Sequence, residues 1–114
     1  MTIIYKVCPI AEWNAAQKAS SYGGSPNDGI DGFMHFSAPQ QLRETVRRHF
    51  EGQSDLVLLT VEAEALGPAL RWEPSRGGDL FPHLYGPLAV AHVSKAEPLP
   101  LGPDGAHVFP AEVP

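Results

Sequence analysis

The chain has 114 residues, of which 43% are hydrophobic and 18% are charged, and its net charge is −5. This length fits one domain, and the apolar fraction is high enough for a packed core, so wholesale disorder is excluded. The acidic balance argues against nucleic-acid binding, which usually requires a basic face, because only Arg43 to His49 is locally basic.

The N-terminal residues and the single cysteine bear on where the protein is located and on whether it contains a disulfide. The start of the chain lacks the charged and apolar regions of a signal peptide, and no apolar run approaches the roughly 20 residues that cross a bilayer. We therefore expect a cytoplasmic protein with no membrane partner. Cys8 alone cannot form an internal disulfide, and its place at the end of an apolar run indicates a half-buried small hydrophobe.

The first third of the chain is predicted to contain a strand, a helix and a loop. Thr2 to Val7 is rich in β-branched residues, which favours a strand, and Pro9 suits the first turn of a helix that continues to about Ala19. Ser20 to Gly32 is rich in Ser, Gly, Asn, Asp and Pro, which predicts a loop. A loop this long is uncommon in a compact domain, and such loops often carry function.

The stretch GFMHFS contains the first candidate for chemistry. Phe33 to Phe36 is predicted as a short strand, and the alternation of side chains places His35 and Ser37 on the same face. Ser37 is predicted to cap a helix that runs to about Glu51, so backbone N–H donors would gather beside His35 as a perch for an anion or pyrophosphate. The alternative is a histidine in a hydrogen-bonded corner, with Ser37 only capping the helix.

The rest of the chain is predicted to consist mainly of strands. Asp55 to Ala63 contains an unbroken LVLL run, which predicts a central strand, and shorter strands follow near Leu70 to Glu73 and within Pro87 to Leu99. Residues 1–99 are expected to form one compact α+β domain with split, mixed or antiparallel sheets and two helices. Residues 100–114 include four prolines and are predicted to be a loosely ordered tail.

The stretch FPHLYGP contains the second candidate histidine. A proline fixes the backbone before His83, and His83 and Tyr85 share one side of an extended segment, which suits the wall of a binding site. An imidazole can act as an acid or a base near neutral pH. The alternative is that the aromatic side chains pack and His83 caps a turn. Together with His35 it supplies too few ligands for a metal, and no metal-binding spacing is present.

The stretch WEPSRGG supplies further polar candidates near the second histidine. Arg76, in a glycine-rich turn, could grip a phosphate or carboxylate with two hydrogen bonds, and Trp72 could lie against a ring of the ligand. Glu73 could orient a histidine or pair with Arg76, although a surface ion pair would contribute only about 0–1 kcal/mol. Tyr5 and Lys6 on the first strand form a weaker third element.

At GFMHFS, WEPSRGG and FPHLYGP the sequence resembles a family of small bacterial proteins known as domain of unknown function 952. The opening IIYKV, the helix residue Trp13, the strand DLVLLTVEA and the LRWE segment fit the resemblance as well. It covers roughly Ile3 to Leu99, which is nearly the whole domain. Several separated motifs in the right order make the resemblance specific.

That resemblance implies a fold similar to the ADP-ribosyltransferases and the tRNA 2′-phosphotransferases, in which two small sheets enclose a dinucleotide cleft. Enzymes of that fold carry a three-part signature, with one residue on each of three strands. By this likeness Tyr5 or Lys6 would supply the first element, His35 the second and His83 the third.

Two functional hypotheses and one structural alternative follow from these motifs. The first is a transferase, or a lapsed one, that binds NAD or an ADP-ribose-like ligand, with NAD as a candidate substrate. In it His35 and His83 are the catalytic residues, and His83 is the base or orients the ribose. Ligand contacts are expected from His35 and Ser37 near ribose or pyrophosphate, Trp72 and Tyr85 near a ring, and Arg76 on phosphate. The second is a binding module that kept the cleft without the chemistry. In the structural alternative both histidines serve only the fold.

Overall fold

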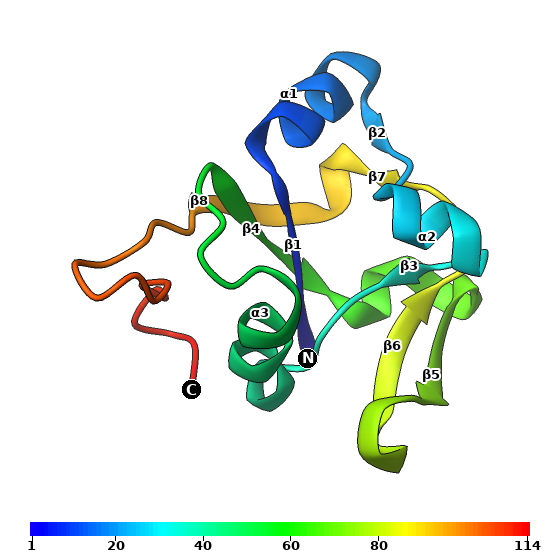
Figure 1. Cartoon of the computed structure of the whole chain (residues 1–114). Helices are drawn as coiled ribbons and strands as arrows, with labels where there is room; N and C mark the ends of the chain where they lie inside the picture. The colour runs from blue at the N-terminus through cyan, green and yellow to red at the C-terminus, as the bar shows by residue number, and fades with distance from the viewer.

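The computed structural model describes residues 1–114 and contains three small antiparallel sheets (Figure 1). The largest sheet, sheet A, has the strand order β1 (Ile3–Pro9), β4 (Leu56–Glu62) and β8 (Val93–Pro98). The predicted central strand is confirmed, because β4 pairs with β1 on one side and β8 on the other. Its unbroken apolar run is buried because packed side chains cover both faces of the sheet.

Two smaller sheets complete the strand content. Sheet C has the order β3 (Met34–His35), β6 (Leu80–Leu84) and β5 (Leu70–Pro74), and a two-stranded sheet joins β2 (Ser21–Tyr22) to β7 (Leu88–Ala89). All of these pairs are antiparallel. The predicted α+β class with separate small sheets is confirmed, although none of the sheets is mixed.

The helix content differs from the prediction in one segment. Helix α1 (Ile10–Ala19) and helix α3 (Leu42–His49) were expected, but α2 (Pro26–Asp31) lies within the predicted loop. The prediction of two helices is therefore wrong, because a capping box starts a third. The Ser25 hydroxyl accepts from the Asp28 N–H, the Asp28 carboxylate accepts from the Ser25 N–H, and proline occupies the first turn. Short 3-10 turns occupy Pro39–Gln41, Ala63–Ala69, Arg76–Gly78 and Val90–His92.

Ser37 does not cap a helix, so the expected perch of backbone donors is wrong. Its backbone N–H and carbonyl pair with those of Tyr5, each at 2.8 Å, and this bridge ties sheet C to sheet A. The chain turns one residue later, where the Gln41 side chain accepts from the Ala38 N–H at 2.9 Å. Helix α3 begins only at Leu42, so the free N–H donors at its start are not beside His35.

Two hydrophobic clusters pack on sheet A, and the C-terminal residues belong to the second. The first cluster contains Trp13, Met34 and Leu84 among its members, and the second lies beneath α3. Leu99 and Val113 are buried in the second cluster, so the expected loosely ordered tail is instead folded back onto the domain. No helix has both the length and the apolar character needed to cross a bilayer.

Arg43 holds the end of the chain in place, which gives a direct test of the docked tail. Its Nε donates to the carbonyl of Pro114 at 2.6 Å, and its guanidinium lies 4.6 Å from the ring centroid of Phe109. We expect Arg43→Ala to speed hydrogen exchange at the Val113 amide by about fivefold, because losing these contacts costs about 1 kcal/mol. Arg47→Ala, which removes an exposed arginine of the same helix, should leave that exchange rate unchanged.

Candidate functional site

One face of sheet C gathers most of the polar candidates, and the other face packs into the core. His35 lies directly opposite His83 in the β3–β6 register, while the neighbouring pair Met34 and Leu84 belongs to the first hydrophobic cluster. The two histidine rings are 5.6 Å apart at their centroids, and the Phe33 ring stacks on His83 at 4.1 Å. The two histidines that the sequence singled out are thus neighbours.

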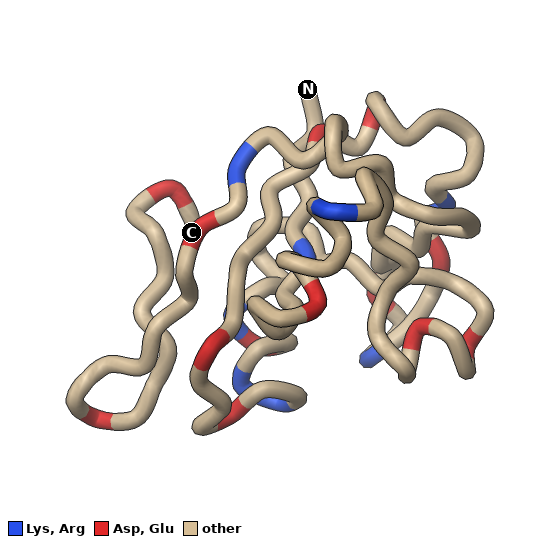
Figure 2. The backbone as a smooth tube through the Cα atoms, turned by 90° about the horizontal axis from the view of Figure 1, so that it is seen from above, with Lys and Arg blue, Asp and Glu red and all other residues tan.

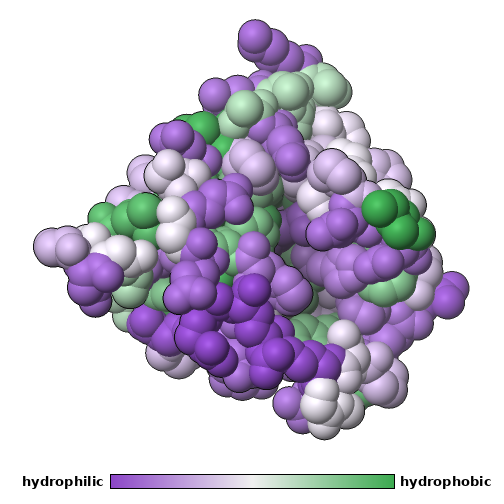
Figure 3. Space-filling view, viewed as in Figure 1, coloured by the Kyte–Doolittle hydropathy of each residue, from purple (hydrophilic) through white to green (hydrophobic).

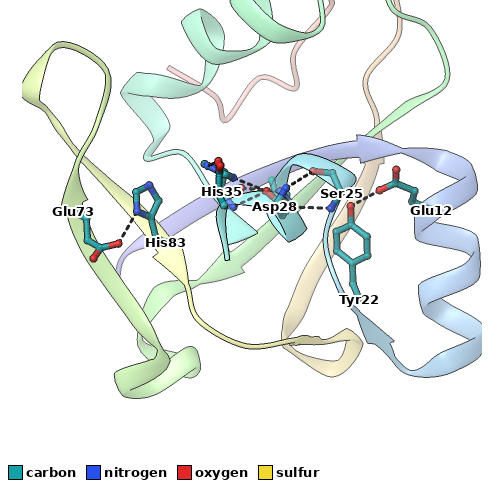
Figure 4. A network of polar contacts seen from close by, with 9 residues as sticks. Glu12, Tyr22, Ser25, Asp28, His35, Glu73 and His83 are labelled. Atoms are coloured by element: carbon teal, nitrogen blue, oxygen red, sulfur yellow. Dashed lines mark hydrogen bonds and ion pairs between the residues drawn. The ribbon is translucent and has the colours of Figure 1, made fainter. Parts of the chain in front are cut away.

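His83 is held from behind by a carboxylate. Its Nδ1 lies 2.8 Å from Glu73 Oε1 (Figure 4). The Tyr85 hydroxyl donates to the same oxygen at 2.7 Å. These hydrogen bonds, the one from Tyr85 foremost, hold the pKa of Glu73 below its usual value. A carboxylate only accepts, so Nδ1 carries a proton, and in the neutral ring Nε2 keeps its lone pair. No protein group is bonded to Nε2, so this nitrogen can accept a proton from a ligand.

His35 belongs to a separate network around a buried ion pair. Asp28 Oδ1 lies 2.6 Å from His35 Nδ1, and Asp28 Oδ2 lies 2.9 Å from the ammonium of Lys6. Lys6 also donates to the His35 carbonyl at 2.8 Å, and only 4% of Asp28 is exposed. Burial by itself would raise the pKa of Asp28, but the His35 hydrogen bond and the Lys6 charge hold it far below its ordinary range. The network joins β1, α2 and β3 (Figure 4).

Both ring nitrogens of His35 face acids, which distinguishes it from His83. Nε2 lies 2.9 Å from Asp31 Oδ2, in addition to the contact of Nδ1 with Asp28. The contact of Nδ1 is a hydrogen bond, whereas that of Nε2 is an ion-pair contact with a half-exposed carboxylate. Each ring nitrogen of His35 therefore has a carboxylate within 3 Å. His83 is therefore the better placed of the two to act as a base.

The histidines border a cleft of about 960 Å³ that runs between α2 and α3. The space-filling view shows a hollow whose rim is mainly hydrophilic (Figure 3). Charged residues of both signs line the cleft, and Lys and Arg as well as Asp and Glu positions are scattered over the backbone (Figure 2). The predicted site residues that line the cleft are Tyr5, Lys6, His35, Ser37, Arg76 and His83. Trp72, Glu73 and Tyr85 do not line it.

Strand alternation determines where the side chains of Tyr5 and Trp72 lie. The Tyr5 side chain lies on the opposite face of β1 from Lys6, in the second hydrophobic cluster, where burial raises its pKa. Trp72 is 40% exposed and lies on the face of β5 away from Glu73. Tyr85 contacts Glu73 and Phe33 but does not line the cleft itself. The expected aromatic wall of Trp72 and Tyr85 is therefore wrong, and Phe36, Phe50 and Phe81 line the cleft instead.

Arg76 lies at the cleft, but its partner is not Glu73. Its Nη2 donates to Thr45 Oγ1 at 3.2 Å, its Nε lies 3.4 Å from Glu44 Oε2, and its guanidinium is 5.0 Å from the centroid of Phe81. These contacts come from α3 and β6, on both sides of the arginine. The side chain is therefore held against the wall with part of its guanidinium available to a ligand.

Several residues of the site were missed by the sequence reasoning. Asp28, Asp31 and Thr45 line the cleft, and Phe33 covers one side of the His83 ring. The capping-box spacing from Ser25 to Asp28 is the one signal that could have found the aspartates, because it marks the start of a helix. Nothing in the sequence alone pairs Asp28 with Lys6.

Cys8 is a structural residue of the core. It is 1% exposed, and burial raises the pKa of its thiol to about 11. A thiol with that pKa has little thiolate near neutral pH, so it is a poor nucleophile. No group of three or more His, Cys, Asp or Glu side chains is arranged to hold a metal ion.

Comparisons with known proteins place the chain in a family. It is similar to the crystal structure of CC0527 from Caulobacter crescentus, with 50% identity over 94% of each chain and a TM-score of 0.90. It is also similar to the solution NMR structure of CC0527, with 52% identity over 93% of this chain and 91% of the other, and a TM-score of 0.84. No curated protein matches. The model of one family, described as protein of unknown function (DUF952), matches residues 7–96, and the chain belongs to that family.

Proposed function

We propose that the cleft binds a nucleotide-type ligand, such as NAD or ADP-ribose, and that the chain is a divergent ADP-ribosyl- or 2′-phosphotransferase. The observation that carries this proposal is the pair of Glu73 and His83, in which the carboxylate occupies Nδ1 and leaves Nε2 free beside the cleft. The same arrangement makes a histidine a general base in many enzymes.

Size and lining support a ligand of this class. The cleft volume of about 960 Å³ lies at the upper end of the range of small-molecule sites. Aromatic and apolar side chains offer surfaces for a base or a ribose, and Arg76 offers a charge for a phosphate. The fold similarity to the ADP-ribosyltransferases that the family resemblance implies is the reason for naming NAD and ADP-ribose among such ligands.

In ADP-ribosyl transfer, Nε2 of His83 would take the proton of an acceptor hydroxyl as its oxygen bonds to the ribose C1′ of NAD. The bond from C1′ to the nicotinamide nitrogen breaks, and nicotinamide leaves with the electron pair. Glu73 would hold the imidazole in the required tautomer and stabilise the imidazolium that forms. His35 would have a structural role in this scheme, since both of its nitrogens are occupied.

A non-enzymatic binding module is the second candidate function, and the His35 network favours it. The position that would supply the second signature element is bound on both nitrogens by acids, and Lys6 is neutralised by Asp28. A cleft in which Lys6 and His35 are already paired with acidic side chains could still bind its ligand without catalysing a reaction. Both candidates predict ligand binding, and they differ only in catalysis.

Titration with NAD and with ADP-ribose, followed by two-dimensional NMR, tests the binding shared by both candidates. We expect the amide signals of residues 32–37 and 81–86 to shift in a saturable way, because these segments border the cleft. Amides of β8, on the outer edge of sheet A, serve as the internal control. Unmoved signals for the cleft segments at millimolar ligand would refute the proposal.

A further inference from the structure

A corner of the cleft holds two hydroxyl groups and a cation that have donors left over. Ser37 follows β3, Thr45 lies on α3, and Arg76 lies in the turn between β5 and β6. The Ser37 hydroxyl is 3.2 Å from Thr45 Oγ1, and Arg76 Nη2 donates to the same Thr45 oxygen at 3.2 Å. All three residues line the cleft, and only 3% of Ser37 is exposed.

The two hydroxyl groups have more protons to donate than there are protein acceptors within hydrogen-bond distance of them. Each hydroxyl has one proton to donate, and the contact between Ser37 and Thr45 uses one of the two, whichever residue donates it. Arg76 only donates, so it accepts neither proton. No other protein acceptor is bonded to either hydroxyl, so one hydroxyl proton remains for a group in the cleft.

Arg76 also keeps donors for a ligand. Its Nη2 contacts Thr45 and its Nε faces Glu44, which leaves the Nη1 group without a protein partner. Packing over Phe81 holds the guanidinium in place, so fewer rotamers are lost when it binds a ligand. Glu44 does not line the cleft, so its carboxylate would not face an incoming anion directly.

We propose that Ser37, Thr45 and Arg76 form an oxyanion subsite that takes a phosphate group. Phosphate oxygens accept charge-assisted hydrogen bonds from hydroxyl and guanidinium groups. Here these donors come from three separate segments that surround one point. The naming of a nucleotide phosphate rests on the proposed function, whereas binding of the oxyanion itself does not. Thr45 becomes a binding residue that no sequence motif indicated.

The test uses inorganic phosphate as the probe and compares two threonine variants. Thr45→Val removes the hydroxyl with little change of shape, and Thr60→Val is the matched control, because the buried Thr60 Oγ1 has no hydrogen-bond partner. In the wild-type protein, phosphate should shift the Arg76 Nε–H signal and the amides of Ser37 and Thr45. Thr45→Val should weaken phosphate binding about tenfold, and Thr60→Val should leave it unchanged.

Further arms separate failure of the subsite from failure of the proposed function. Arg76→Gln, a change in an exposed turn, should also weaken phosphate binding about tenfold or more, and it keeps the test decisive if Thr45→Val does not fold. AMP should bind more tightly than adenosine to the wild-type protein, and the two should bind equally to Arg76→Gln.

The outcomes distinguish the two proposals. If ADP-ribose binds but neither variant weakens phosphate binding, the subsite is wrong and the proposed function stands. If phosphate binds at this corner but ADP-ribose does not bind, the subsite stands without the proposed function. Absence of phosphate shifts at tens of millimolar overturns the subsite.

Discussion

Asp28→Asn should lower the free energy of unfolding by about 3–5 kcal/mol at neutral pH, which is a large part of the stability of a domain of this size. The substitution leaves the Lys6 ammonium buried without its counter-charge, with 6% of that residue exposed. It also replaces a carboxylate that accepts from Ser25, His35 and Lys6 with an amide, which has one acceptor oxygen. Urea denaturation followed by circular dichroism measures the change.

Asp31→Asn is the matched control for this prediction. Asp31 also contacts His35, but its side chain is 48% exposed and it has no contact with Lys6. We expect its loss to cost no more than about 1 kcal/mol, because exposed ion pairs contribute little. Equal losses for the two variants, or a loss below 1 kcal/mol for Asp28→Asn, would show that the buried pair does not hold this part of the fold.

The pH dependence of stability gives the same network a second test. The pKa of Asp28 is lowered in the folded protein, so below about pH 4 the unfolded chain, with its ordinary carboxyl, binds more protons than the folded one. The contribution of Asp28 is therefore present above about pH 4 and is lost as the pH falls toward the folded value. The wild-type protein should lose stability more steeply than Asp28→Asn below pH 4, so the two curves should converge in acid.

The fold could be predicted from the sequence where the signal is local and repeated. The α+β class, helix α1 and the central strand β4 follow from composition, helix starts and an apolar run. The short helix α2 was missed because glycine and proline marked its segment as a loop, although the capping box at Ser25 overrides that tendency. The docked tail depends on Arg43 and Val113 meeting across the domain, a contact between residues far apart in sequence.

The sequence singled out both histidines of the site but not their arrangement. Alternation paired His35 with Ser37 and His83 with Tyr85, whereas the structure places His35 directly opposite His83 in neighbouring strands of sheet C. Of the two carboxylates, Glu73 was expected to orient a histidine or to pair with Arg76, and it contacts His83 because β5 lies next to β6. Asp28 was missed, and it reaches His35 because α2 folds over β3. Such pairings depend on how elements pack, which no periodicity records.

The two hydrogen-bond networks of the cleft wall have different roles. The network around Asp28 stabilises the fold, and the pair of Glu73 and His83 faces the ligand. Asp28 links Lys6 to His35 and thereby connects sheet A to sheet C, together with the backbone bridge from Tyr5 to Ser37. In that construction both ring nitrogens of His35 face carboxylates, and β3 pairs with β6. The free nitrogen of His83 is positioned as a result, because its strand pairs with β3. Loss of Asp28 should therefore disturb the His83 side of the cleft as well.

His83→Gln should reduce transfer by about 10²- to 10⁴-fold if the chain is a transferase, because it removes the general base. Ligand affinity should change little, since the glutamine amide can occupy a similar volume beside Phe33. Release of nicotinamide from NAD measures turnover, and the NMR titration measures binding on the same samples. His92→Gln, an exposed histidine outside the cleft, should match the wild-type protein in both measurements.

Glu73→Gln and Tyr85→Phe separate the role of the base from the role of the group that orients it. Glu73→Gln leaves His83 without an acceptor-only partner, so either tautomer can form, and we expect kcat to fall by about 10- to 100-fold with KM unchanged. Tyr85→Phe removes one donor to Glu73 but keeps the contact of Glu73 with His83, so kcat should stay within about threefold of wild type. A wild-type protein that binds NAD and releases no nicotinamide would favour the binding module. Full turnover in His83→Gln would show that the base lies elsewhere in the cleft.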